Sequence, residues 1–478
     1  AEEPAAMRAL TLEFDPYEQM ARRIEALQNN GHPTDKIEYI IKGGTWNSYP
    51  LGYQYWFILR SFQACNELAI MSLRGVNPDQ NRDEGRSNLT VNTSTTDPTR
   101  LLRPDSVGTR NDTYKQPELT EHSPLPELRA ELLRQQSINE TAAHRIIGLT
   151  LETRPDCIND HTIWIMRELG ATRLEIGLQH TDDDILTLIK RGHTATEAKD
   201  ALELLRNYGF KADVHLMPQL PGSTPDRDLA MIKKTFDDPG FKPDMIKLYP
   251  CSVVKNSELY DWFLEGKYKA YPTTDLIRIL KEGQRLLPRY TRVSRLIRDI
   301  PSHYIEEGNK VTNLRQVVED EMKRDGIQCQ CLRCREVGHV DPKTIADPTP
   351  VLYVDEYATH GGTEYFLSFE DKDRRVVFAF CRLRILGKNP SQKPKKIHYP
   401  AFIRELHTYG KLLELGTRNV DESQHKGLGR KLVEKAEEIC RIQHISTLAV
   451  ISGVGVRDYY RKWGYELENT YMVKKLTP

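Results

Sequence analysis

The sequence has no excess of charge of either sign, since its 478 residues include 68 Lys and Arg and 68 Asp and Glu. Net charge therefore points to no class of partner, and only local clusters of charge can. No apolar run approaches the roughly 18 residues that a membrane-spanning helix needs. The chain opens on the acidic AEEPAAMRAL, without the basic and apolar regions of a signal peptide. We therefore expect a cytoplasmic protein without a membrane partner.

Cysteine is also scarce, and eight residues in a chain of this length do not suggest a disulfide scaffold. Three of them crowd into the segment CQCLRC as Cys329, Cys331 and Cys334. Thiolates at this spacing can wrap one tetrahedral ion, with a fourth ligand from elsewhere. Zinc is the first expectation, iron–sulfur ligation the second, and free thiols the plain alternative. His339 is close in sequence, but no pattern assigns it as the fourth ligand.

The length predicts two or more domains. Five β-branched runs recur in the first 250 residues, separated by stretches of helical period, as in βα units around a parallel sheet. The runs are KIEYIIKGG, RIIGLTLET, RLEIGLQ, KADVHLMPQL and MIKLYP. Polar residues such as Glu152, Gln179 and His215 end these runs, where barrel active sites are built. We predict an α/β fold with a partial (β/α) barrel over residues 1–272, with an open doubly wound sheet as the alternative.

Two segments depart from this rhythm. The stretch from about 76 to 125 is polar and aperiodic, which predicts an insertion. Residues 273–349 are basic and helical in pattern, and they include the three clustered cysteines. In this segment arginines follow steps of three and four, so a helix would place them on one face that suits RNA phosphates. These arginines are Arg285, Arg289, Arg292, Arg295 and Arg298. A solvated helix face is the alternative.

A second α/β domain is predicted over residues 350–478, where four strand-like runs precede a helix and a further strand. The helix follows the sequence QHKGLG, whose glycines allow close backbone approach to a ligand. The free N–H groups at the start of the helix would face a phosphate. With ELHTYG upstream and VRDYYRKWGYE downstream, this order resembles the GNAT acetyltransferase superfamily.

The GNAT resemblance implies an acetyl-CoA site. The loop and helix start would hold the pyrophosphate through Gln424, Gly427, Leu428, Gly429 and Arg430. The preceding strand would line the pantetheine arm with Glu405, Leu406, His407 and Thr408. Tyr460 would lie nearest the thioester and could donate to its sulfur or acyl oxygen, with an ordinary core aromatic as the alternative.

Longer motifs carry a more specific resemblance. The segments EEPAAMRA, GGT, ETRPD, EIGLQH, HLMPQLPG and ISGVGVRDYYRKWGYE closely resemble the catalytic subunits of Elongator. The resemblance spans nearly the whole chain outside the polar insertion. It implies a radical S-adenosylmethionine (SAM) barrel fused to a GNAT-like domain, acting on the wobble uridine of tRNA.

The Elongator resemblance also implies a reaction. In that family a 4Fe-4S cluster cleaves SAM, and the acetyl carbon radical formed next adds to C5 of uridine. Hydrolysis of the thioester then leaves a carboxymethyl group. By position, Gly43, Gly44 and Thr45 would hold the SAM amino group. Lys36 would contact acetyl-CoA, with a solvated lysine at the start of a strand as the alternative. The family's cluster cysteines precede the EEP segment, so the cluster ligands are expected upstream of this chain.

Partners and alternatives follow from the same resemblance. The implied partners are tRNA, a second copy in a prokaryotic homodimer, and accessory Elongator subunits in a eukaryote. One alternative is a lysine (histone) acetyltransferase, for which Glu405 and Glu414 are the local candidates as base. The other is a tRNA-binding scaffold with a regulatory acetyl-CoA site. The tRNA-modifying hypothesis requires a path between Tyr460 and Gly44 that a pantetheine arm can span.

Overall fold

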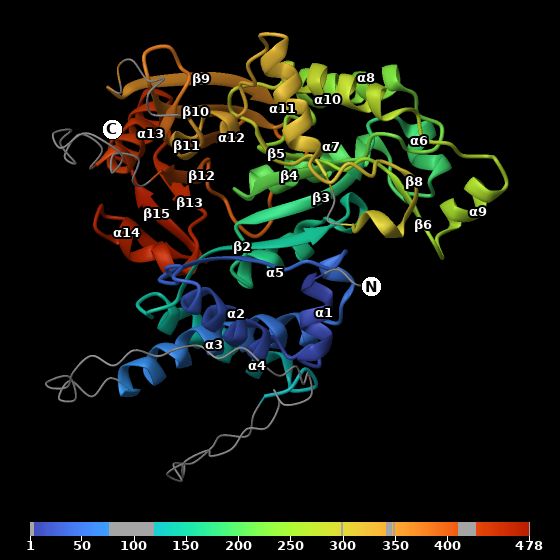
Figure 1. Cartoon of the computed structure of the whole chain (residues 1–478). Coiled ribbons are helices and arrows are strands. Elements are labelled where there is room, and N and C mark those ends of the chain that lie inside the picture. The colour runs from blue at the N-terminus through green and yellow to red at the C-terminus, as the bar shows by residue number, and fades with distance from the viewer. Residues whose placement is uncertain are drawn as a thin grey trace, which may run out of the picture.

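The computed structural model describes residues 4–75, 119–297, 300–340, 347, 349–409 and 427–477. A six-stranded and a seven-stranded sheet lie side by side, and helices α1 to α4 pack together at one end of the molecule (Figure 1). No helix in these ranges has the length and apolar character needed to cross a membrane. Most of the predicted insertion and Gln424, Arg298 and Glu414 lie outside the described residues.

The six-stranded sheet is parallel throughout and has the order β1-β2-β3-β4-β5-β7. Its strands are β1 (Lys36–Ile40), β2 (Arg145–Thr153), β3 (Arg173–Gln179), β4 (Lys211–Leu216), β5 (Met245–Leu248) and β7 (Arg292–Arg295). All five predicted runs form strands of this curled half-barrel, so the predicted partial barrel is confirmed. The sixth strand, β7, was not predicted.

Helices connect and cover the strands of this barrel sheet. They are α1 (Pro4–Thr11), α2 (Pro16–Asn29), α3 (Leu51–Gly75), α4 (Leu125–Asn139), α5 (Asp160–Glu168), α6 (Asp183–Leu188), α7 (Ala195–Asn207), α8 (Pro225–Asp237), α9 (Glu258–Leu264) and α10 (Thr273–Arg285). Capping boxes at Asn159 and Thr194 satisfy the first N–H groups of α5 and α7. The short strands β6 (Ser252–Val254) and β8 (Ile305–Gly308) pair with each other outside the main sheet.

The single helical face predicted for the arginine run is wrong. Helix α10 ends at Arg285, and Arg292 to Arg295 form strand β7. Pro288 lies between them, and a proline cannot donate the N–H that would continue a helix. Because side chains alternate along a strand, the arginines of this run do not share a face.

The segment after β7 leads to the second sheet through α11 (Leu314–Arg324) and α12 (Leu332–Arg335). The second sheet has the order β14-β15-β13-β12-β11-β10-β9. Its strands are β9 (Val351–Thr359), β10 (Gly362–Glu370), β11 (Val377–Leu386), β12 (Ala401–Thr408), β13 (Thr447–Val450), β14 (Glu466–Glu468) and β15 (Tyr471–Lys475). Helices α13 (Leu428–Ile442) and α14 (Arg457–Arg461) complete it. The predicted second α/β domain is therefore present.

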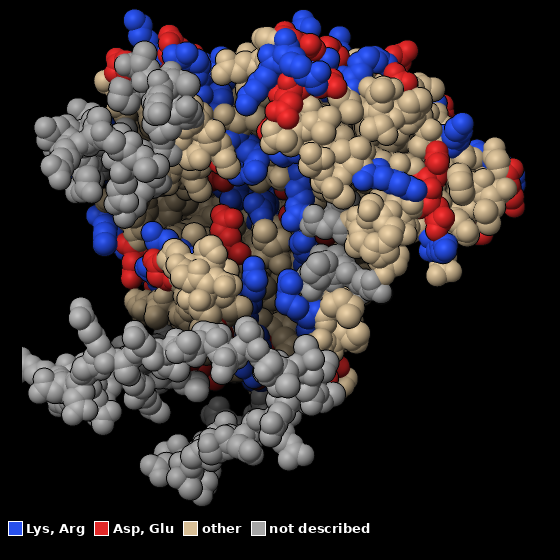
Figure 2. Space-filling view, viewed as in Figure 1, with Lys and Arg blue, Asp and Glu red and all other residues tan. Residues whose placement is uncertain are grey.

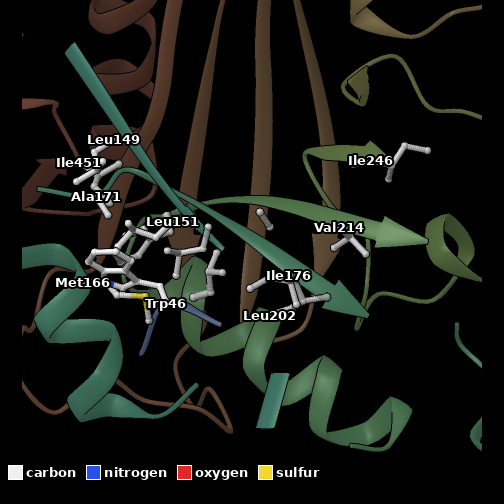
Figure 3. Close-up of a cluster of buried hydrophobic side chains, with 14 of the residues drawn as sticks. Trp46, Leu149, Leu151, Met166, Ala171, Ile176, Leu202, Val214, Ile246 and Ile451 are labelled. Carbon is white, nitrogen blue, oxygen red and sulfur yellow. The ribbon is translucent and has the colours of Figure 1, made fainter. Parts of the chain in front are cut away.

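The two sheets share a hydrophobic core. Ile451, which follows β13, lies beside Leu149 and Ala171 of the barrel region (Figure 3). Gly453 packs so tightly on Ile147 that a Cβ there would collide with the Ile147 backbone. The ring of Phe402 in β12 packs closely on Gly209, where an added Cβ would lie 2.9 Å from the ring. These close contacts hold the second sheet against the N-terminal ends of the barrel strands.

Candidate active site

A cavity of about 1020 Å³ opens at the C-terminal ends of the barrel strands. Gly43 and Gly44 border it directly after β1, with φ angles of +138° and +89° that favour glycine. A Cβ on either glycine would meet nothing within 4 Å, so open space adjoins this backbone. Thr45 caps the short 3-10 turn Trp46–Ser48 and is not among the residues that line the cavity.

Charged side chains form the floor of this cavity. Lys247 donates a hydrogen bond to Glu175, and His215 Nε2 lies 3.3 Å from Glu175 Oε2. Burial acts to raise the pKa of Glu175, but His215 and Lys247 outweigh it and lower this pKa to about 2. Asp213 lies deeper, where burial raises its pKa and Oδ1 has no hydrogen-bond partner within the described chain. An ionised Glu175 at the cavity floor therefore lies beside the deeper Asp213, whose carboxyl retains its proton more readily.

A row of polar side chains continues from this floor through the half-barrel. Lys211, Asp213 and His215 occupy alternate positions of β4, so they share one face of the strand. His215 borders the cavity, whereas Lys211 begins the strand at the opposite end. There Lys211 Nζ lies 3.2 Å from Glu405 Oε1 of β12. The polar row thus links the cavity to the second sheet, and Figure 2 shows Lys and Arg side chains in a hollow between the sheets.

Strand β12 has an open edge, which we define as the backbone of Glu405 to Thr408 on the side of β13. β12 pairs with β11 as far as Thr408, but it pairs with β13 only over Ala401–Ile403. β13 ends at Val450, the partner of Ile403, so the β12 backbone beyond Ile403 has no strand partner on that side. A strand edge of this kind offers unpaired N–H and C=O groups to an extended ligand. The strand expected to line a pantetheine arm therefore has the geometry to do so.

The start of α13 lies beside the end of this open edge. Gly427 has a φ of +91° and precedes the helix, whose first turn contains no acidic residue. A Cβ on Gly429 would lie 2.5 Å from Tyr459 Oη and 3.3 Å from the Thr408 side chain. Leu428 is buried, whereas Arg430 is exposed and bonds Glu434 at 2.7 Å. The unpaired N–H groups of this helix start are suited to an anion near Thr408.

Two further predicted site residues occupy different places. Tyr460 is buried in the hydrophobic cluster between α13 and the second sheet, and burial raises its pKa. Lys36 is exposed at the start of β1, at the opposite end of that strand from Gly43 and Gly44. Lys36 and Glu405 therefore lie at the N-terminal end of the barrel strands, whereas Tyr460 lies on the α13 side of the second sheet. Gly43 and Gly44 lie at the C-terminal end of the barrel strands.

The three clustered cysteines have metal-ligand geometry. The sulfur atoms of Cys329, Cys331 and Cys334 lie within 4.8 Å of one another. A trio of thiols suits a metal ion, and zinc stays the prediction made from the sequence. His339 does not join this group, since its Nε2 lies 3.3 Å from a Glu336 carboxylate oxygen. The fourth ligand remains unassigned among the described residues.

The arginine run mostly anchors this segment and its neighbours. Arg292 forms an ion pair with Glu336, and Arg289 donates to the Arg374 carbonyl at 2.8 Å. Arg295 borders the cavity, and Arg285 is exposed at the end of α10. The structure therefore separates residues that the sequence grouped together.

Sequence reasoning missed a buried charge network between the sheets. Arg404 of β12 contacts Asp244 at 2.6 Å and 2.7 Å and Glu364 at 2.8 Å. Arg382 contacts Glu405 at 2.8 Å, and Arg384 contacts Glu364 at 2.6 Å. The available signal was the sequence FCRLRIL, in which charges alternate with apolar residues inside a strand. Such charges need buried partners.

Comparison with known proteins agrees with this architecture. A model described as the radical SAM superfamily matches residues 108–234, and one for the radical SAM C-terminal domain matches residues 243–324. A protein of Methanocaldococcus jannaschii named tRNA uridine(34) acetyltransferase is 39% identical, over 99% of this chain and 77% of its own length. Elongator complex protein 3 of Homo sapiens is 35% identical, over 99% of this chain and 76% of its own length.

A solved structure gives the same result. Methanocaldococcus infernus Elp3 with an N-terminal deletion matches with a TM-score of 0.79 at 37% identity, over 98% of this chain and 97% of that chain. The chain belongs to the Elongator complex protein 3 family. The resemblance read from the sequence motifs is therefore confirmed, as is its radical SAM component.

Radical SAM proteins of this kind use SAM and a 4Fe-4S cluster. The cavity of this Elongator complex protein 3 family member fits SAM, because it joins open glycine backbone to a charged floor. No cysteine is among the residues that line the cavity, and all eight cysteines of the chain are described elsewhere in the fold. Residues in the described part of the chain therefore do not supply the cluster ligands.

Proposed function

We propose that the chain builds a carboxymethyl group on C5 of the wobble uridine of tRNA, from acetyl-CoA and with SAM. The observation that carries this proposal is the polar row from the cavity, along β4, to the contact between Lys211 and Glu405. It places a site suited to SAM and a site suited to acetyl-CoA at opposite ends of one strand of the half-barrel. A reaction that needs both compounds requires two such sites close together.

Acetyl-CoA binding is supported by the open edge of β12 and the start of α13. The helix N–H groups would bind the pyrophosphate, and Glu405 to Thr408 would bind the pantetheine arm through their backbone. The proposed loop residue Gln424 and the exposed Arg430 would add polar contacts to the phosphates. The arm would point toward the barrel, since β12 packs against it through Phe402 and Glu405. Lys36 would contact the acyl end from the start of β1, and Tyr460 would support the thioester from the α13 side.

The cavity residues would bind SAM and the uridine. Backbone groups of Gly43 to Thr45 would hold the amino-acid end of SAM, and SAM with its cluster would supply a radical that activates the acetyl methyl group. The cavity wall also carries the aromatic rings of Tyr249, His303 and Tyr304. Such rings can stack on a base that has left its helix.

Contacts with tRNA phosphates would come from basic residues around the cavity. Lys42, Lys255 and Arg295 line it, and Arg285 is exposed nearby in sequence. Arg289 and Arg292 already bond protein groups, so their contribution would be to hold the segment in place. Zinc at the three clustered cysteines would be structural. The relatives named Elongator complex protein 3 support accessory subunits as partners in a eukaryotic source.

Transfer of acetyl to a lysine is less well supported by the charges. Glu405, a candidate base, is ion-paired with Arg382 and Lys211. Burial acts to raise the pKa of Glu405, but Lys211 and Arg382 outweigh burial and lower it well below its usual range. A carboxylate held in this way is a poor proton acceptor. The other candidate, Glu414, lies outside the described residues.

One assay distinguishes the three functions. The full-length protein is incubated without oxygen with tRNA, SAM, a reductant and acetyl-CoA labelled in its acetyl group. We expect label in the uridine base as a carboxymethyl group. Label on protein lysines would instead support the acetyltransferase, and bound but unlabelled tRNA would support the scaffold.

A further inference from the structure

His407 lies on the face of the second sheet that packs against the barrel. Side chains alternate along β12, and Leu406 faces the hydrophobic cluster that contains α13. Glu405 and His407 therefore face the other way, where Glu405 contacts Lys211 of the barrel. The His407 ring stacks on Phe380, with ring centres 5.7 Å apart, and lies 4.5 Å from the ring of Tyr409.

The open edge of β12 defines a route to this face. An acyl-CoA whose phosphates lie at the start of α13 has its arm on the α13 side of the sheet, beside Thr408. Because β13 ends at Val450, the partner of Ile403, no strand pairs with this side of β12 beyond that point, and the arm would pass there to the barrel side. Its thioester then emerges on the barrel side, where His407 projects.

The chemistry around His407 suits a base. The ring is half-buried, and none of the described residues forms a hydrogen bond with its nitrogens. Charged groups from four strands face it: Glu405 of β12, Lys211 of β4, Glu38 of β1 and Arg292 of β7. Burial lowers the pKa of His407, and the positive charges of Lys211 and Arg292 lower it further. The carboxylates of Glu405 and Glu38 act to raise this pKa, but the net shift is downward. A lowered pKa favours the neutral imidazole, which is the form that can accept a proton.

We propose that His407 is the general base that activates water for hydrolysis of the thioester. The inference rests on the proposed function, in which the carboxymethyl group leaves CoA by this step. His407 removes a proton from water as the water oxygen bonds to the thioester carbonyl carbon. The tetrahedral intermediate then collapses, the C–S bond breaks, and the imidazolium returns its proton to the CoA sulfur. Water is consumed, free CoA and a carboxylic acid form, and the acid ionises to a carboxylate by releasing the second proton of the water to solvent. No oxidant or reductant is needed.

The test is a single-turnover reaction with the full-length protein carrying His407→Gln or His407→Asn. We expect tRNA with CoA still attached to uridine to accumulate, and free CoA to appear 10²- to 10⁴-fold more slowly, the usual contribution of a general base. Mass spectrometry of digested tRNA detects the adduct. Acetyl-CoA affinity should change less than about twofold, because the β12 backbone supplies that binding. The matched control is His444→Gln, an exposed histidine after α13, which should behave as wild type.

A second readout uses the wild-type protein alone. Thioester hydrolysis should fall at acid pH with a midpoint below the ordinary histidine value of about 6.5, and this decline should be absent in the Gln variant. The inference is overturned if the wild type lacks the decline, if both variants release CoA at the wild-type rate, or if they merely lose acetyl-CoA binding. If the wild type binds acetyl-CoA but never modifies uridine, the proposed function fails as well, and the two failures are thereby distinguished.

Discussion

At the scale of single residues, the contact between the two sheets is centred on the ion pair of Asp244 and Arg404. Both are buried, and two carboxylate oxygens of Asp244 meet two nitrogens of Arg404. Arg382 adds a second cation 3.4 Å from Asp244. Removing one partner from such a buried set leaves an uncompensated charge, which is more costly than the net value of the pair.

Asp244→Asn should therefore destabilise the protein by about 3–5 kcal/mol at pH 7, measured by urea unfolding. Burial acts to raise the pKa of Asp244, but Arg404 and Arg382 outweigh it and lower this pKa. A lowered folded-state pKa gives stability that is present above the unfolded value, about 3.9, and is lost as the pH falls further. The difference between wild type and variant should therefore shrink below about pH 4.

The matched control is Asp373→Asn, whose carboxylate is 60% exposed and pairs with Arg375. A change within about 0.5 kcal/mol is expected there. Equal unfolding midpoints for Asp244→Asn and wild type would contradict the importance of the buried pair.

Individual site residues were predictable where a motif dictates backbone conformation. Gly43, Gly44 and Gly427 have positive φ angles, and only glycine takes these without strain, so the sequence marks them. His407 was predicted only as part of a backbone site. Its side-chain role depends on Glu38, Lys211 and Arg292, which come from three other strands and become neighbours only in the fold.

Helix α13 and its leading glycine are the clearest functional unit at the scale of elements. Gly427→Ala places a Cβ on a left-handed residue, at a cost of roughly 1–2 kcal/mol, and should turn the first N–H groups away from the proposed phosphate site. We expect the acetyl-CoA dissociation constant to rise about tenfold, which corresponds to 1.4 kcal/mol, as measured by calorimetry.

Gly266→Ala is the matched control for this strain. Gly266 also has a positive φ, and a Cβ there would likewise meet nothing within 4 Å, but it follows α9 far along the chain. It should lose similar stability and bind acetyl-CoA normally. Equal losses of acetyl-CoA affinity in both variants would exclude a phosphate site at Gly427.

The segment with the three clustered cysteines allows a separate prediction. Cys331→Ser should remove the zinc, measured as metal per chain by mass spectrometry, and lower the melting temperature, because metal binding contributes to folding. Cys157→Ser, at a half-buried cysteine outside the group, should retain the metal. A wild-type protein without zinc after expression in zinc-supplemented medium would refute the site.

The elements that sequence patterns predicted best are those with strong periodicity. The five barrel runs all form strands, because short runs rich in β-branched residues between helical stretches favour strands over other structures. The arginine run failed because a spacing of three and four is also compatible with a turn followed by a strand. Pro288 separates α10 from β7. Val293 lies in β7 and is buried in the core, so its packing favours the strand.

At the scale of the whole molecule, the two sheets form one packed unit. Ile451 lies in the barrel core, Arg404 reaches Asp244, and Glu405 reaches Lys211. This arrangement could not be predicted from either half of the sequence, since each contact pairs residues far apart in the chain. It places the face of β12 that carries Glu405 against the barrel of the same chain.

Both halves of the proposed reaction should therefore occur within one chain. Gly429→Trp would collide with Tyr459 and Thr408 and block acetyl-CoA, whereas Gly44→Trp would fill the cavity beside the SAM position. Each full-length variant should be inactive alone, and an equimolar mixture should also form no carboxymethyluridine, because neither acyl site can reach the intact barrel of the other chain. Each variant should retain the other ligand, which calorimetry checks. Recovery of product in the mixture would show that acyl groups pass between chains and would contradict a reaction confined to one chain.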